Sequence, residues 1–397
     1  MAHHSIFIES RGSARKYLED IGASSPGIEY MISKAVFRCI KLKNIPHRAA
    51  NILKQEMLAK GGEAAVSREA AGCGDGGGDV LLLGTVKQYT LLVEKLKLQP
   101  FGLGAVAADI EKILKSQEEA GGEIALAQGQ ILAWGKRTVV MGILNATPDS
   151  FSDGGRYLDP ARAYEHALEM RDQGADIIDV GGASSRPDAT IASEDEELER
   201  VIPLVRKLSG AGLIVSVDTF RAEVARQALD NGAHIINDIG SLELDPDLLE
   251  VLVKWQAPVV LMHNRLQLRR HEPYDNLIDD IADELAQAAD KAEAAGLEPG
   301  KIILDPGLGF GKTTAQNRLL VKRLRDFKSL GKPLLVGASR KSFIGATLAL
   351  EVEERLEGSL AVMAAAIMNG ADMVRVHDVR ESCRLARMLD AIRSEDG

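Results

Sequence analysis

The sequence has few cysteines, few aromatic residues and no long apolar run. Only 3 of its 397 residues are cysteine, and aromatic residues make up 4%. Cys39, Cys73 and Cys383 lack CxxC spacing, so we expect no disulfide framework, and a reducing cytoplasm fits this usage. No apolar stretch approaches the ~20 residues of a membrane span, and the start, MAHHSIFIES, lacks a signal-peptide core. We therefore expect a cytoplasmic protein with no membrane association.

Positive charge is also scarce. The formal net charge is −10 and the sequence pI is about 5.4. Nonspecific nucleic-acid binding depends on clustered Lys and Arg, so this composition predicts no nucleic-acid partner. Any anionic substrate must be held by a few local cations. A hydrophobic content of 45% is ample for two domains and one large core.

From residue 138 onward, one pattern repeats: a short apolar segment, a polar tip and an amphipathic helix. The segments are rich in Val, Ile and Leu without clean alternation, which is typical of parallel strands buried on both faces. Eight such units in about 260 residues predict a (β/α)8 TIM barrel, with a doubly wound open sheet as the structural alternative. The predicted strands are 138–145, 177–182, 213–219, 235–240, 258–263, 301–307, 333–339 and 373–379. The predicted helices are 159–173, 193–208, 221–231, 246–255, 276–295, 316–329, 356–369 and 380–393.

Polar side chains follow the predicted strands, where a barrel of this kind places its active site. The most informative stretch is MGILNATPDSFSDGG at 141–155, an apolar strand running into a polar, glycine-ended loop. Asp218, Asn237 and Asp305 suit a flat, donor-rich heterocycle, because carboxylates accept paired N–H bonds and an amide both donates and accepts. The cations at other strand ends suit a phosphate group; they are Arg186, Lys341, Arg375 and His377.

Three local patterns favour simpler interpretations. The segment GLGFGKT at 307–313 is no phosphate-binding P-loop, because GxxxxGK[ST] would require glycine where Pro306 stands. The acidic run 194–197 is interpreted as the first turn of a helix. His263 follows an apolar strand, and a lone histidine there is about as often structural as functional.

In their order along the chain, the motifs resemble those of the dihydropteroate synthase family. They are MGILNATPDSFSDGG, SSRP, VDT, IND, MH, DPGLGFGK, SRKS and VRVHDV, and the resemblance covers roughly residues 128 to 393. It implies a transferase of an alkyl group other than methyl, acting in folate biosynthesis. The implied reaction condenses 6-hydroxymethyl-7,8-dihydropterin diphosphate with 4-aminobenzoate and releases diphosphate, by a dissociative, cation-like substitution.

The resemblance also implies roles for individual residues. The implied pterin contacts are Asp218, Asn237, Met262, Asp305, Lys341 and Arg375. Asn145, Arg375 and His377 would bind the diphosphate, with Asn145 also a ligand of Mg2+. The implied 4-aminobenzoate pocket comprises Ser185, Arg186, Pro187, Phe310, Lys341 and Ser342, and loop acids Asp149 and Asp153 have an open role. Lys341, Arg375, His377, Arg186 and Asp305 are the candidate catalytic residues. A homodimer is also implied.

Residues 183–188 depart from the family pattern. Many relatives read Glu-Ser-Thr-Arg-Pro-Gly where this chain reads ASSRPD, which puts acceptor and sulfonamide affinity in question. A pterin-binding methyltransferase acting on methyltetrahydrofolate and a corrinoid protein is one alternative function. Others are a synthase with a different arylamine acceptor and a catalytically silent scaffold. The SRKS motif and the three residues implied to bind the diphosphate, Asn145, Arg375 and His377, speak against the methyltransferase.

Residues 1–120 carry no family motif that we recognise. Their pattern predicts a small α/β (α+β) domain with helices at 12–21, 47–60, 86–97 and 104–118 and strands at 35–42, 63–67 and 79–85. Glycine-rich 71–78 is expected to be a loop. Residues 121–137 are predicted to be a linker and a hairpin capping the barrel, which would span 138–397. The role of the first domain is open between dimer stabilisation, covering the barrel's closed end, and interaction or regulation.

Overall fold

The computed structural model describes residues 2–72, 76–118, 121–146, 160–182, 192–266 and 273–395. The chain forms two compact units, one up to residue 119 and the other from residue 120. Each unit has its own buried apolar clusters. No helix in the described ranges is long and apolar enough to cross a membrane.

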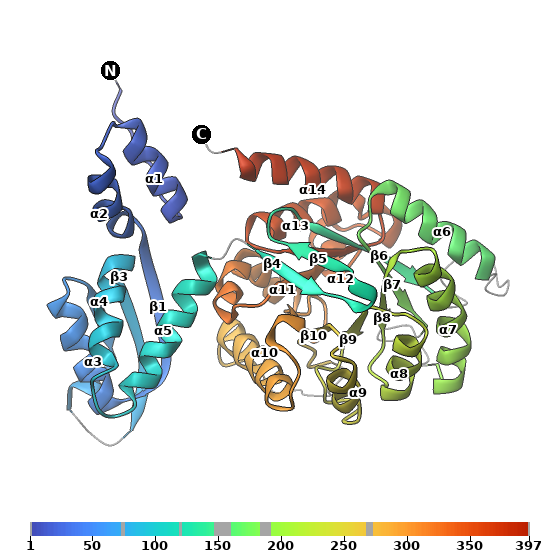
Figure 1. The fold of residues 1–397 in the computed structure, drawn as a ribbon, viewed down its shortest axis with the longest axis horizontal. Helices are drawn as coiled ribbons and strands as arrows, with labels where there is room; N and C mark the ends of the chain where they lie inside the picture. Colours follow the sequence, from blue (N-terminus) through green and yellow to red (C-terminus); the bar gives the residue numbers. More distant parts are fainter. Residues whose placement is uncertain are drawn as a thin grey trace. The chain divides into compact units, whose positions relative to one another are not determined.

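The first unit is a three-stranded antiparallel sheet packed against helices (Figure 1). The central strand β3 lies between β1 and β2. Alternate residues of β1 and β3, such as Ile40 and Leu82, are buried against α3, α4 and α5, as the period of two in a strand requires. The elements are α1 Arg11–Asp20, α2 Ser25–Ala35, β1 Phe37–Pro46, α3 His47–Ala59, β2 Glu63–Val66, β3 Gly77–Thr85, α4 Val86–Leu96 and α5 Leu103–Glu118.

Two details of this unit differ from the sequence prediction. Helix α2 was not predicted, although Ser25 and Pro26 provide the start signal of a helix, since proline is favoured in the first turn. Strand β1 runs on to Pro46, four residues beyond the predicted end. Proline is tolerated there because β1 is an edge strand, which has a free side.

The second unit is a parallel eight-stranded barrel with helices around it (Figure 1), which confirms the predicted fold class. The strand order is β11-β10-β9-β8-β7-β6-β13-β12, and a parallel bridge between Leu304 and Leu334 joins its two ends. Its strands are β6 Val139–Asn145, β7 Ile177–Gly181, β8 Ile214–Asp218, β9 Ile235–Asp238, β10 Val259–Met262, β11 Ile302–Asp305, β12 Leu335–Gly337 and β13 Met373–Val376. Its helices are α6 Pro160–Gln173, α7 Glu194–Gly210, α8 Ala222–Asp230, α9 Leu248–Trp255, α10 Leu277–Ala294, α11 Thr314–Lys322, α12 Ser342–Leu348, α13 Leu356–Met368 and α14 Val379–Ser394.

The region after β11 is more broken than predicted. The single helix expected at 316–329 is α11 followed by a 3-10 helix at Leu324–Leu330. One helix, at 356–369, was expected after the strand at 333–339, but a short helix, α12, precedes α13 there. The acidic run 194–197 does form the first turn of α7, with Ser193 as its N-cap. Glu197 from that turn is buried and pairs with Arg221.

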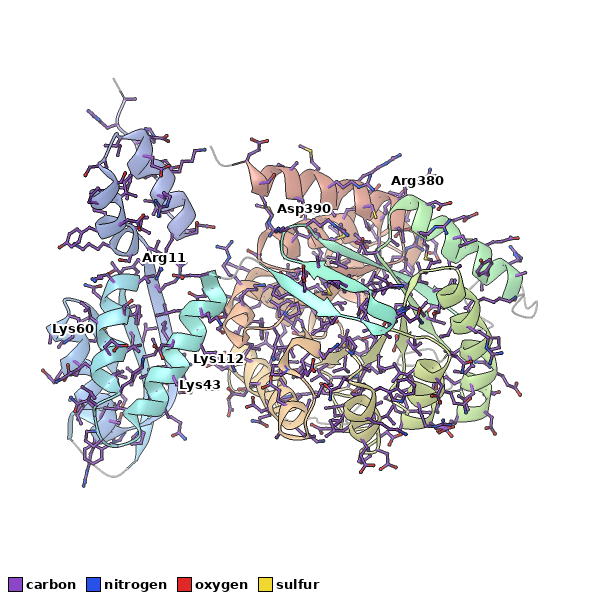
Figure 2. All side chains as sticks on the ribbon, in the orientation of Figure 1. Arg11, Lys43, Lys60, Lys112, Arg380 and Asp390 are labelled. Atoms are coloured by element: carbon purple, nitrogen blue, oxygen red, sulfur yellow. The ribbon has the colours of Figure 1, made fainter. Side chains whose placement is uncertain are left out.

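A two-stranded hairpin packs against the amino-terminal ends of the barrel strands. It consists of β4 Gly122–Ala125 and β5 Ile131–Trp134. Ile124 and Leu132 share an apolar cluster with the first inward residues of the strands, such as Val139 and Met373. Asp390 of α14, labelled in Figure 2, accepts from the backbone N–H and hydroxyl of Thr138 at 2.8 Å each, where β6 begins. The amino-terminal end is therefore closed by packing, and the strands' carboxyl ends are left for the site.

Candidate active site

Residues from several strand ends line one hollow at the carboxyl end of the barrel. Of the residues predicted from the sequence, those lining it are Asp218, Asn237, Met262, Asp305, Phe310, Lys341, Arg375 and His377. Three of these end a strand, namely Asp218 in β8, Met262 in β10 and Asp305 in β11. The parallel register brings them together, because Met262 pairs with Asp305 and Asp218 with Asn237.

Arg375 forms the centre of a buried charged network. It extends from β13 to two acids on β7 and β8, its Nε donating to Asp179 Oδ2 at 2.6 Å and its Nη2 to Asp218 Oδ2 at 2.7 Å. Asn237 Nδ2 donates to the same oxygen of Asp179 at 3.1 Å. Buried ions need such partners, since an isolated charge in a protein interior is costly. The network fixes the plane of the guanidinium, which is the cation that stacks on flat rings.

Asp179 is the site residue that the sequence interpretation missed. Its side chain is fully buried, and its Oδ1 has no hydrogen-bond partner among the described residues. The available signal was a charged residue inside an apolar strand, IIDVG, because an aspartate is rarely fully buried unless paired. The prediction missed Asp179 because it considered only polar residues at the strand ends, and Asp179 lies in the middle of β7.

The glycine-rich segment after β11 supports the opposite wall. Asp305 Oδ1 accepts from the Gly307 N–H at 2.7 Å, which fixes its carboxyl group. Lys341 Nζ donates to the Leu308 carbonyl at 2.6 Å and lies 4.0 Å from the centroid of the Phe310 ring. This segment therefore places an acid, a cation and an aromatic face on one side of the hollow.

Burial changes the acid–base behaviour of these groups. Burial raises the pKa of Asp218 to about 7, opposed by the nearby Arg375 cation. It also raises the pKa of Asp305, which the Gly307 N–H opposes. The pKa of Lys341 falls to about 8, because burial disfavours its charged form and the Asp305 carboxylate compensates only in part. Lys341 is still mainly cationic at pH 7.

His377 lies at the exposed rim of the hollow. Its backbone N–H donates to Ser339 Oγ at 3.2 Å, and its Nδ1 lies 3.1 Å from the same oxygen. Arg340 and Asp378 pair at 2.5 Å next to this contact. Two cross-links thus join the loop that carries Lys341 to the loop that carries His377.

The other predicted residues are placed less centrally or not at all. Asn145 ends β6 beside Gly181, and Ser342 is exposed as the first residue of α12; neither lines the hollow. The rest lie outside the described residues, namely Asp149, Asp153, Ser185, Arg186 and Pro187. The departures from the family pattern at 183–188 also fall there.

A parallel eight-stranded barrel with acids, an amide and cations around one hollow at its carboxyl end defines a (β/α)8-barrel enzyme for a polar ring. A family model described as "pterin binding enzyme" matches residues 141–377. A dihydropteroate synthase of Clostridium beijerinckii is 49% identical over 260 residues, which are 65% of this chain and 95% of the relative. The chain therefore belongs to the dihydropteroate synthases of the pterin binding enzyme family.

Two further comparisons bear on the two units. The probable bifunctional folylpolyglutamate synthase/dihydropteroate synthase of Halobacterium salinarum is 41% identical over 395 residues, 98% of this chain and 47% of the relative. This chain thus spans about half of that relative, and the match includes the amino-terminal unit. The solved dihydropteroate synthase of Xanthomonas albilineans with 4-aminobenzoic acid is 39% identical, with a TM-score of 0.65, covering 69% of this chain and 99% of its own.

Proposed function

We propose that this protein condenses 6-hydroxymethyl-7,8-dihydropterin diphosphate with 4-aminobenzoate, producing 7,8-dihydropteroate and diphosphate for folate biosynthesis. The observation that carries the proposal is that buried acids and an amide face cations in one hollow. The 4-aminobenzoic acid in the Xanthomonas albilineans structure supports the choice of acceptor.

Three polar side chains are proposed to hold the pterin ring. Asp218 and Asp305 would accept its N–H groups, and Asn237 would donate and accept. Arg375 would lie against the ring, held in orientation by Asp179 and Asp218. Met262 supplies an apolar contact in the same hollow.

The reaction is proposed to be dissociative. The bond between the exocyclic carbon and the diphosphate oxygen breaks, its electron pair leaves with diphosphate, and the ring stabilises the cation at carbon. The arylamine nitrogen then forms the new C–N bond and loses a proton to solvent. Arg375 and His377 would stabilise the negative charge on the leaving group, which is the main demand of such a step.

The acceptor is proposed to bind against Phe310 and Lys341, whose ammonium lies over the aromatic ring. Ser185, Arg186, Pro187 and Ser342 would complete this pocket, as the family resemblance implies. Asp149 and Asp153 are assigned to the loop over the site without a defined contact.

The residues present fit a Mg2+ ion held largely by substrate. Among the described residues, no group of three or more His, Cys, Asp and Glu side chains could hold a metal ion. Mg2+ commonly keeps several waters and binds substrate phosphates, so one protein oxygen is enough. Asn145, the last residue of β6 at the carboxyl end of the barrel, could supply it. When bound, Mg2+ would add positive charge at the diphosphate.

One assay tests the proposed reaction: diphosphate release from the pterin diphosphate, with and without 4-aminobenzoate and with and without Mg2+. We expect release coupled to arylamine, dependent on Mg2+ and reduced by orders of magnitude in Lys341→Ala. Lys322→Ala, at an exposed lysine, is the matched control. Arylamine-independent release, or full activity of Lys341→Ala, would contradict the proposal. Other arylamines in place of 4-aminobenzoate test the acceptor.

We also propose that the enzyme acts in the cytoplasm as a homodimer, as the family resemblance implies. Sedimentation velocity should then give twice the chain mass of 42.7 kDa. A species of single chain mass at micromolar concentration would contradict this.

A further inference from the structure

Lys312 has an unusual set of partners for a lysine. Its Nζ lies 2.8 Å from the Gly307 carbonyl oxygen, 3.0 Å from that of Phe310 and 2.9 Å from His263 Nδ1. A longer contact of 3.5 Å joins Nζ to the His263 carbonyl oxygen, so all four acceptors around this three-donor group are uncharged. The cation thus bonds to both sides of the turn made by residues 307–310.

His263 receives this contact in its neutral form. Burial lowers the pKa of His263 to about 4, so the ring is uncharged at pH 7. With the Lys312 ammonium as the donor to Nδ1, the ring proton of the neutral imidazole belongs on Nε2, which lies 3.2 Å from Glu284 Oε2. Because His263 directly follows β10, the end of that strand positions the imidazole that contacts Lys312.

The turn held by Lys312 carries groups that face the hollow. Leu308 accepts from Lys341 Nζ at 2.6 Å, and the Phe310 ring lies 4.0 Å from that nitrogen. Glycine at 309 permits this packing, because a Cβ there would lie 2.8 Å from Lys341 Cδ. Lys312 bonds to the turn from outside the lining of the hollow, and Lys341 bonds to it within the hollow.

We propose that Lys312 is a positioning residue for the arylamine acceptor, acting through the turn at 307–310 on Phe310 and Lys341. The inference rests on the proposed function and extends it to a residue outside the lining of the hollow. The buried cation keeps the turn in one place, so that the aromatic face and Lys341 form a pre-organised wall. Without it, the two carbonyls lose a charged donor, and the wall moves.

Other groups around Lys312 are consistent with this role. Burial lowers the pKa of Lys312 to about 7, Lys341 and Arg265 act in the same direction, and Asp305 and Glu284 oppose. Neither of these carboxylates is among the hydrogen-bond acceptors of the ammonium. The cation is therefore directed at the backbone of the turn and at His263, as a positioning role requires.

The test compares Lys312→Met and Lys312→Gln with Lys322→Met, an identical change at an exposed lysine ten residues further along. Steady-state kinetics give kcat and the KM of each substrate, pterin fluorescence gives binding of the pterin alone, and circular dichroism reports folding. We expect Lys312→Met to raise the KM for 4-aminobenzoate at least about tenfold while pterin affinity changes less than about threefold. Lys312→Gln should show a smaller rise, because one donor to a carbonyl can remain.

Each other outcome overturns the inference. Kinetics like those of Lys322→Met would show that the turn does not need the cation. An equal loss of pterin and arylamine binding, a fall in kcat alone, or failure of both variants to fold would make Lys312 merely structural. Inactive wild-type protein would instead contradict the proposed function, so the two failures are distinguishable.

Discussion

At the scale of single residues, the site depends on charges that are buried in pairs. Asp179, Asp218 and Arg375 lie on three strands, yet their side chains meet within 2.7 Å. Removing one partner of a buried ion pair leaves an uncompensated charge, which costs more than the pair contributes. Substituting Asp179 or Asp218 is therefore expected to change the orientation of Arg375 first.

Asp179→Asn is expected to reduce kcat/KM while the protein stays folded. The amide has the same shape but loses the charge-assisted bond to Arg375, worth ~1.5–3 kcal/mol, or roughly 10- to 150-fold in rate. Steady-state assays of diphosphate release measure this, with Asp172→Asn at an exposed position as control. Unchanged kcat/KM would mean that Arg375 needs no second acid.

The pKa of Lys341 predicts a pH dependence. Lys341 is protonated below its pKa of about 8 and loses its charge as the pH rises through that value. We therefore expect kcat/KM for the pterin diphosphate, which reports on the free enzyme, to fall above about pH 8. The pKa of Lys312 is about 7, so the profile is also measured in Lys312→Met. A profile that is flat to pH 9.5, or a falling limb that disappears in Lys312→Met, would contradict the assignment to Lys341.

At the scale of elements, the segment after β11 connects two strand ends by close backbone approach. Gly307 has φ +68°, and a Cβ there would overlap the His263 carbonyl oxygen. The His263 N–H also donates to the Asp305 carbonyl at 2.9 Å. Glycine is required at this position both for its conformation and for the space.

Gly307→Ala should therefore be strongly destabilising. A left-handed backbone with a Cβ and a clash with fixed backbone together predict a loss of about 2–4 kcal/mol in the free energy of unfolding. Gly300→Ala is the matched control, because nothing lies within 4 Å of its Cβ and its φ is ordinary. Urea unfolding distinguishes them. Equal midpoints would show that the segment can relax.

Hydrophobic patterning predicted the strands better than the short helices. The eight apolar segments became the eight barrel strands, because strands buried on both faces form near-continuous apolar runs that are easily recognised. Helix α2 was missed, and the helix expected at 316–329 is interrupted, since short helices and 3-10 turns depend on packing more than on pattern. Lys312 appeared in the rejected P-loop and in the motif DPGLGFGK but was given no role, although that motif also contains Asp305 and Phe310.

At the scale of the whole molecule, two units fold around separate cores. The amino-terminal core includes Leu53 and Tyr89, and the barrel core includes Val217 and Leu304. The Clostridium beijerinckii relative is covered almost entirely by the barrel part, whereas the Halobacterium salinarum relative matches both units. A separable catalytic unit is consistent with both comparisons.

A chain of residues 121–397 is accordingly expected to fold and to keep kcat within about threefold of the full protein, since a domain with its own core can fold alone. Calorimetry of the full chain and of the shortened one should show a shared barrel transition. The matched control is a chain of residues 2–119 alone, which should show the unfolding transition of the full chain that the barrel lacks. A folded but inactive barrel would show that the amino-terminal unit contributes to the site.

The sequence by itself determined the barrel, the order of its strands and which polar residues lie at their ends. These follow from local periodicity and from the rule that parallel strands share one active end. Only the tertiary structure decided which side chains meet: that Arg375 is held by Asp179 and Asp218, and that Lys312 bonds to the turn bearing Phe310. The reason is that such pairs join residues far apart along the chain, so their geometry depends on strand register and side-chain burial, which no local pattern contains.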